Sequence, residues 1–376
     1  MRKWINKGLN TYLNYKSFKS KKRFVIIESD DWGSLRTQDI ASLNQLNKIS
    51  NAVKKDRYTQ LDSIASQEDL QALFEVLQSV KDQKGNPACL TANVCTANPD
   101  FEAIKACNYE EFSYHPFTKT LSDYSKDIDL FEIWLEGKYN KVFVPQLHGR
   151  EHLHALAWLK ELKAGNKDLL KAFELNTWGV PYTAKLNQRR KNLQAALDIY
   201  GIEGEKDYHL QWITDAAKIF KQHFDKSATS FIAPAYIWHS NHHAALVDAK
   251  IKTLQGIKLQ YEPKTPTKGY NKKLHYIGKT DTNQELIFAP RNAFFEPHSA
   301  PHKDWVDVCL KKVKDAFENQ KPAIISSHRI NFVGRLNTKH RDFNLKILRE
   351  LLKRIVKKYP DVEFIDSGSL YTYIKS

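Results

Sequence analysis

The sequence predicts an α/β protein built as a (β/α) barrel of the TIM type, with seven or eight mainly parallel strands. Short apolar, β-rich runs alternate with helical patterns along most of the 376 residues, which is typical of parallel sheets whose strands are joined by helices. No Gly-x-Gly-x-x-Gly loop follows the first strand, so a barrel is favoured over a dinucleotide-binding sheet. The length also suits one barrel, because such domains commonly reach about 250 residues or more.

Strands are expected where apolar and β-branched residues run between turn residues. The first of them reads Arg-Phe-Val-Ile-Ile-Glu. In chain order, the expected strands are 23–28, 88–95, 141–146, 229–233, 255–261, 286–290, 322–327 and 362–366. Residues 262–285 are rich in Lys, Thr, Pro and Gly, which indicates an irregular excursion or a hairpin.

Helices are expected between these strands. Ser66 precedes Gln-Glu-Asp, a capping-box pattern, and apolar residues then recur at helical spacing up to Val80. The last long helix, 342–358, is expected to stop before Pro360, since proline disfavours helix at the preceding residue. The other expected helices are 150–163, 186–199, 209–224 and 303–318.

Residues 23–376 are expected to form a single domain, preceded by a basic helix or extension at 1–22. The net charge is +15. Because the Lys residues are spread along the chain, a solvated surface is the favoured explanation, and attraction to an anionic partner is the alternative. No Arg-rich arm or zinc-finger pattern is present, so nucleic acid is not expected as a partner.

The N-terminus begins with positive charge, but no apolar core of a secretory signal follows. No stretch is long and apolar enough to span a membrane. We therefore expect a cytoplasmic protein, with peripheral membrane contact through residues 1–22 as the minor alternative. The sequence leaves the oligomeric state open.

The most informative polar residues are Asp30 and Asp31, which directly follow the first strand. Loops at strand ends carry the chemistry in barrels of this type. Adjacent carboxylates repel, so the pair needs a cation, a proton or strong hydrogen bonds. The alternative is a turn or helix-capping pair without function. The following residues, Trp32 and Gly33, indicate a tight turn with an aromatic wall.

His148 and His152 follow the strand at 141–146. A helix beginning at His148 would place both rings on one face, within reach of one ion, whereas Gly149 and the preceding proline indicate a strand exit. His154 is expected to lie outside this pair.

The same segment, His-x-x-Glu-His with Glu151, also matches the inverted zinc-peptidase pattern. That pattern requires a long helix, so the peptidase interpretation is the weaker one.

Three later strand ends carry further polar or aromatic residues. His328 ends the strand at 322–327 and is either a hydrogen-bonded structural residue or a functional one. Tyr236 and Trp238 follow another strand and form either core or a sugar-stacking wall. Arg291 makes either a surface salt bridge or a contact that holds a catalytic carboxylate.

Together these motifs resemble the polysaccharide deacetylases of the NodB-homology type, within the glycoside hydrolase/deacetylase superfamily. The likeness consists of Asp-Asp after a first strand, His-x-x-x-His after a later one, a Pro-aromatic turn and a late strand ending in His. It runs in order from about residue 23 to 366. The first motif departs from the usual Thr-Phe-Asp-Asp-Gly, because here it reads Glu-Ser-Asp-Asp-Trp-Gly.

The resemblance implies metal-dependent carbohydrate esterases on a deformed barrel. It implies that Asp31, His148 and His152 bind a divalent ion, most often zinc, with manganese, cobalt or nickel as alternatives. Asp30 would be the general base and His328 the general acid, and a backbone N–H near Ala235 or Tyr236 would hold the oxyanion. Arg291 would replace the family's arginine two residues before the third-motif proline, where this chain has Ile232. The candidate substrate-binding residues are Trp32, Tyr236, Trp238 and Glu151.

The expected function is therefore removal of an acetyl or other acyl group from a carbohydrate, by N- or O-deacetylation. The substrate could be anionic, for example an intermediate of surface-polysaccharide synthesis. One alternative is a glycoside hydrolase using Asp30 or Asp31 with Glu151 or Glu296 as the acid. The other is a non-catalytic carbohydrate-binding protein that uses its basic surface and Trp32, Trp178 and Trp238.

Overall fold

The computed structural model describes residues 8, 11–186, 189–265, 269–283 and 285–376. A curled sheet, almost wholly parallel, forms its centre, in the order β12-β13-β9-β8-β5-β2-β1-β15-β14, with β16 beside β1. The strands are β1 (Arg23–Trp32), β2 (Leu90–Cys95), β5 (Phe143–Gly149), β8 (Ser230–Phe231), β9 (Thr253–Gly256), β12 (Lys279–Thr280), β13 (Ile287–Pro290), β14 (Ala293–Phe294), β15 (Ala323–His328) and β16 (Val362–Phe364).

The sheet curls until its two edges come together at one segment of chain. Strand β13 pairs with β9 and strand β14 pairs with β15, and only Arg291 and Asn292 separate β13 from β14. The backbone N–H of Arg291 reaches Gly256 on one side, and that of Asn292 reaches Ile324 on the other. The fold class is thus the predicted α/β barrel of mainly parallel strands.

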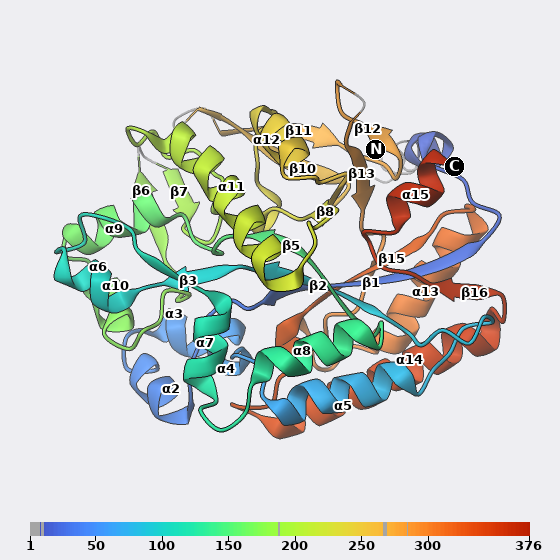
Figure 1. Cartoon of the computed structure of the whole chain (residues 1–376), viewed down its shortest axis with the longest axis horizontal. Helices are drawn as coiled ribbons and strands as arrows, with labels where there is room; N and C mark the ends of the chain where they lie inside the picture. The colour runs from blue at the N-terminus through green and yellow to red at the C-terminus, as the bar shows by residue number, and fades with distance from the viewer. Residues whose placement is uncertain (1–7, 9–10, 187–188, 266–268, 284) are drawn as a thin grey trace.

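Helices cover the outside of this sheet (Figure 1). Their bounds are α2 (Ile40–Leu46), α3 (Asn51–Lys55), α4 (Arg57–Leu61), α5 (Gln67–Gln78), α6 (Phe101–Ala106), α7 (Phe117–Tyr124), α8 (Leu130–Tyr139), α9 (Ala155–Lys163), α10 (Lys167–Phe173), α11 (Glu205–Phe224), α12 (His243–Asp248), α13 (Trp305–Glu318), α14 (Thr338–Lys358) and α15 (Leu370–Lys375). Helices α5, α8 and α14 lie together along the lower edge of the view. As predicted, a capping box between Ser66 and Asp69 begins α5.

Two large apolar clusters hold these layers together, beside a third, much smaller one that includes Ile26 and Leu370. The larger lies between the sheet and its covering helices and includes Val25, Trp134 and Leu351. The smaller lies beneath α6, α9 and α10 and includes Trp158 and Phe173. Figure 1 shows these three helices on one side of the barrel, next to β6 (Thr183–Leu186) and β7 (Arg189–Asn192).

Besides the antiparallel pair of β6 and β7, two more pairs of antiparallel strands lie off the barrel. Strand β3 (Ala97–Pro99) pairs with β4 (Tyr114–Pro116), and β10 (Leu259–Thr265) pairs with β11 (Gly269–Leu274). The second pair confirms the hairpin expected within 262–285. It also divides the strand expected at 255–261, whose first residues belong to β9.

Two expected helices differ from the structure. The helix expected at 186–199 is wrong, because β6 and β7 form an antiparallel pair there and turns follow. From those turns, Leu193 is buried in the smaller cluster, whereas Ala196 and Leu197 are buried in the larger one. The helix expected at 150–163 begins only at Ala155, so the residues before it form a loop.

Much of the expected N-terminal helix, including Trp4, Ile5 and Leu9, lies outside the described residues. Residues 11–16 are helical, and Leu13 is buried against the body of the protein. No helix within the described ranges combines the length and apolarity needed to cross a membrane.

Candidate metal centre

The carboxyl end of β1 contains a bulge that brings Asp30 and Asp31 to one cavity. Ser29 pairs with Ala92 and Trp32 pairs with Val94, so the two aspartates lie opposite the single residue between those partners. In a regular strand, adjacent side chains point to opposite faces. The bulge, with Asp31 at a left-handed φ of 73°, redirects them. Both line a cavity of about 160 Å³.

His148 lies at a second bulge, on β5. Val94 pairs with Leu147 and Cys95 pairs with Gly149, which leaves His148 as the extra residue. Its Nδ1 lies 2.9 Å from the carbonyl oxygen of Ile232. Because a carbonyl only accepts, Nδ1 carries the hydrogen, which leaves Nε2 as the ring nitrogen that can bind a ligand.

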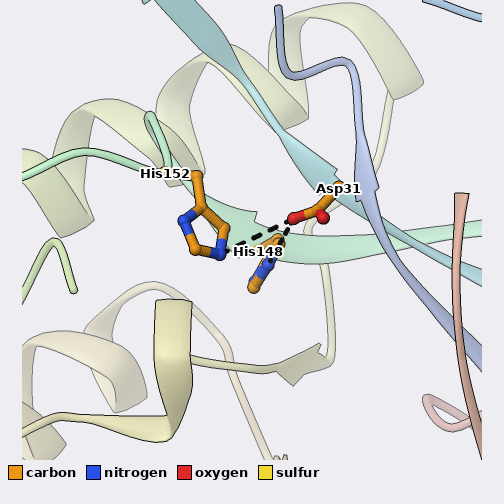
Figure 2. Close-up of side chains that lie close together, drawn as sticks. All are labelled: Asp31, His148 and His152. Carbon is orange, nitrogen blue, oxygen red and sulfur yellow. Dashed lines mark ion pairs between the residues drawn. The ribbon is translucent and has the colours of Figure 1, made fainter. Parts of the chain in front are cut away.

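Asp31, His148 and His152 converge on one point, as Figure 2 shows. Asp31 Oδ1 lies 3.5 Å from His148 Nε2 and 3.6 Å from His152 Nε2, and the ligand atoms all lie within 4.8 Å of one another. Zinc with bonds of about 2.1 Å in a tetrahedral arrangement places its ligand atoms about 3.4 Å apart. The spacing therefore fits one divalent ion.

The charge states of Asp31 and His152 also fit a metal. Burial lowers the pKa of His152 to about 3, so its ring is neutral at pH 7. Burial favours the protonated form of Asp31, but His148, His152 and Arg36 keep its pKa well below the usual range. Within the described part of the chain, Asp31 Oδ1 and His148 Nε2 are buried without a hydrogen-bond partner. A cation would satisfy both atoms, each of which otherwise costs about 1–3 kcal/mol.

Arg291 holds the carboxylate of Asp30 through both of its oxygens. The guanidinium donates from Nη2 to Asp30 Oδ1 at 2.6 Å and from Nη1 to Oδ2 at 2.7 Å, and its Nε donates to Glu28. Burial favours protonation of Asp30, but Arg291 outweighs it and keeps the pKa well below the usual value. Asp30 therefore remains a fixed carboxylate beside the metal ligands.

His328 faces Asp30 from β15, with its Nε2 3.6 Å from Asp30 Oδ2. Its Nδ1 donates to Glu296 Oε1 at 2.8 Å. Burial opposes the charged ring, but the Glu296 carboxylate, with Asp30 and Asp31, raises the pKa of His328 to about 9. The ring is thus an imidazolium at pH 7 whose Nε2–H points toward the cavity side occupied by Asp30.

No protein-family model and no curated protein matches this chain. Among solved structures, a protein described as a polysaccharide deacetylase from Mycobacterium smegmatis aligns over 96% of this chain and 92% of its own, with 8% identity and a TM-score of 0.46. The 4-α-glucanotransferase of Thermococcus litoralis and the α-amylase AmyC of Thermotoga maritima each align over 94% of this chain, with 9% identity and TM-scores of 0.44. The alignments cover 40% and 75% of those two proteins. Likeness this weak says nothing about the reaction.

Of the four residues expected to bind substrate, the structure places only one in the lining of the cavity. Tyr236 lines the cavity, and its hydroxyl lies 3.1 Å from Arg291 Nη1. Trp32 does not form the expected wall: it is 1% exposed and packs edge-on against Phe143 in the core, because the bulge turns it inward. Trp238 is also a buried core residue and does not line the cavity.

Glu151 is likewise outside the cavity lining. It is buried, and it accepts hydrogen bonds from Arg150 and from the hydroxyl of Tyr208. The expectation that Glu151 contacts substrate is therefore corrected, since its carboxylate is taken up by an internal ion pair.

Several cavity residues were missed from the sequence. Arg36 lies 3.7 Å from Asp31 and packs over Trp178, and Tyr58, Asn192 and Gln194 complete the wall. These residues stand in segments without a strand-end pattern. Asn192 and Gln194 were missed because a helix was wrongly expected at 186–199.

Proposed function

We propose that this protein is a metal-dependent hydrolase that removes acyl groups, most simply acetyl, from a carbohydrate by N- or O-deacetylation. The observation that carries the proposal is the convergence of the ionised Asp31 with His148 and His152 on a single point, beside a fixed carboxylate and a charged His. Asp31, His148 and His152 would hold the ion, with zinc the best match to this set of ligands.

A divalent ion in this position lowers the pKa of water and polarises a carbonyl. The remaining steps belong to the protein. Asp30 accepts the proton of the attacking water, and Arg291 holds its carboxylate in place. His328 donates its Nε2 proton to the leaving amine or alkoxide, and Glu296 keeps that ring charged until then.

Backbone at the Pro234–Tyr236 turn supplies the oxyanion donor in this scheme. The N–H of Tyr236 already donates to Ala233 O at 3.0 Å, so Ala235 is the better candidate. Ala235 and Tyr236 both have left-handed φ values, 55° and 58°, and both line the cavity. Strained backbone of this kind is common where a loop is shaped around a ligand.

The glycosidase alternative is supported less well by the same geometry. Both oxygens of Asp30 accept hydrogen bonds from Arg291, and Glu151 is outside the cavity lining. It is distinguished by products: glycosidic cleavage without added metal would favour it over deacetylation.

The first test is the metal content of wild type, Asp31→Ala and His152→Ala, measured by elemental mass spectrometry after saturation with zinc. Replacement of the exposed His302 with Ala is the matched control. We expect the two site variants to lose the ion of this centre, and acetate release from acetylated sugars to fall to background with it. Full retention of zinc and of activity in both variants would overturn the proposal.

A further inference from the structure

A second group of buried ligand-type residues lies outside the cavity. It consists of His154, Glu205 and His209, whose ligand atoms all lie within 4.8 Å of one another. None of the three lines the cavity of the first centre. The proposed reaction has no use for them.

Their positions come from two elements. Glu205 opens α11 and His209 follows four residues later, so both project from the same face of that helix. His154 caps the N-terminus of α9 and lies opposite, with its Nε2 3.1 Å from Glu205 Oε1. A carboxylate and an imidazole one helical turn apart, with a third ligand from a loop, form a common metal-binding arrangement.

His209 is the residue that lacks a partner. It is 2% exposed, and its Nε2 has no hydrogen-bond partner among the residues that the structure describes. Burial, with the neighbouring His154 and His242, lowers the pKa of His209, so the ring is neutral. A neutral, buried imidazole with an unsatisfied nitrogen next to a carboxylate is chemically suited to a cation.

Glu205 is already oriented for such a role. The backbone N–H of Tyr200 donates to its Oε1 at 2.8 Å, and that of Gly201 donates to its Oε2 at 3.0 Å. Burial favours protonation, but His154 and these donors lower the pKa of Glu205, which keeps it ionised. Each carboxylate oxygen retains a second lone pair, so backbone donors here act as supports that aim the carboxylate.

We propose that His154, Glu205 and His209 bind a second divalent ion of the zinc class, with a structural role. Binding requires the His154 proton to move from Nε2, where it faces Glu205, to Nδ1. That movement gives up the hydrogen bond from Nε2 to the carbonyl oxygen of Asp198 at 3.1 Å, the Nε2 contact with Glu205, and the helix-cap hydrogen bond from Ala157 N–H to Nδ1 at 3.3 Å. The ion would replace the first two of these contacts at Nε2.

The second ion would anchor the loop that carries part of the first centre. His152 and His154 are two residues apart in the loop before α9. Tying His154 to α11 therefore restricts where the His152 ring can lie. This inference stands without the proposed function, since it concerns a different set of ligands.

Zinc stoichiometry in Asp31→Asn, His209→Gln and the double variant tests the proposal, by equilibrium dialysis and elemental mass spectrometry. We expect wild type to bind two ions, each single variant one, and the double variant none. A thermal melt with and without zinc gives a second readout: zinc should raise the melting temperature of Asp31→Asn but not that of the double variant. His302→Gln, at an exposed position, is the control.

The outcomes separate the two proposed sites. Asp31→Asn that binds no zinc overturns the second site, and so does an ion that persists in the double variant. One ion in wild type that is lost in His209→Gln and retained in Asp31→Asn supports the second site and contradicts the first. If circular dichroism shows that His209→Gln does not fold, the zinc stoichiometry of Asp31→Asn still tests the second site.

Discussion

Asp30 and Asp31 are adjacent in sequence but have different partners. Asp30 is bound through both oxygens by Arg291, whereas Asp31 Oδ1 faces two imidazoles and accepts no hydrogen bond from any described residue. A carboxylate already bound by a guanidinium is a poor ligand for a cation, whereas one beside imidazoles is a good one. The neighbours, not the residue type, thus separate the proposed base from the proposed ligand.

Arg291 is also predicted to be essential for stability. Arg291→Ala would leave the buried carboxylates of Glu28 and Asp30 without their cation, which should cost about 3–5 kcal/mol of unfolding free energy. Urea denaturation measures this loss. Arg23→Ala, which breaks the exposed pair with Asp361, is the control and should cost about 1 kcal/mol or less. Equal losses in the two variants would contradict the interpretation.

Glu296 is predicted to control the charge of His328. In Glu296→Gln the carboxylate that favours the imidazolium is absent, so the pKa of His328 should fall from about 9. NMR titration of the metal-free protein measures the shift directly. If His328 is the acid, activity is lost as pH rises through its pKa, so the alkaline limb of the pH–rate profile should move to lower pH in the variant. An unmoved limb with a lowered pKa would remove His328 from the acid role.

At the scale of elements, two bulges decide where the proposed ligands point. The strand patterns around 23–28 and 141–146 predict strands but not which residue each bulge adds. His148 and His152 were expected to share a helix face if a helix began at 148. Instead, His148 leaves β5 at a bulge and His152 follows in a loop. The two histidines therefore do come together, but from a bulged strand and a loop and not from one helix face.

Gly149 shows how tightly the second bulge is packed. Its φ is 103°, and an added Cβ would lie 1.7 Å from the Trp212 ring of α11. Gly149→Ala should therefore destabilise the protein by about 1–3 kcal/mol beyond backbone strain and weaken metal binding by moving His148. Gly85→Ala is the control, because Gly85 has a φ of 81° but open space around it. Chemical denaturation and zinc titration of both variants check this, and matching losses would exclude a packing effect.

At the scale of the whole molecule, closure of the sheet brings together residues from distant parts of the chain. Asp31, His148 and His328 belong to β1, β5 and β15, and Arg291 lies where the two sides of the sheet meet. The ends of parallel strands in a barrel lie at one face. The order of the strands in the sequence is therefore enough to predict that these strand-end residues lie near one another.

Metal removal is predicted to destabilise the entire domain, because the ligands connect separate strands. An ion at about 100 times its Kd contributes ~2.7 kcal/mol. Treatment with a chelator should lower the melting temperature, and added zinc should restore it. In Asp31→Ala the contribution of the first centre should be absent from this difference. A wild-type melting temperature that neither the chelator nor zinc changes would contradict both proposed metal sites.

The sequence by itself determined the alternation of strands and helices, the barrel class and the residue types at strand ends. These depend on the spacing of neighbouring residues, which sequence records directly. Only the tertiary structure decided that Trp32 is core, that Arg291 holds Asp30, that Glu296 supports His328 and that His154 meets Glu205 and His209. Such contacts and charge states depend on distances between residues far apart in the chain, and local patterns carry no record of those distances.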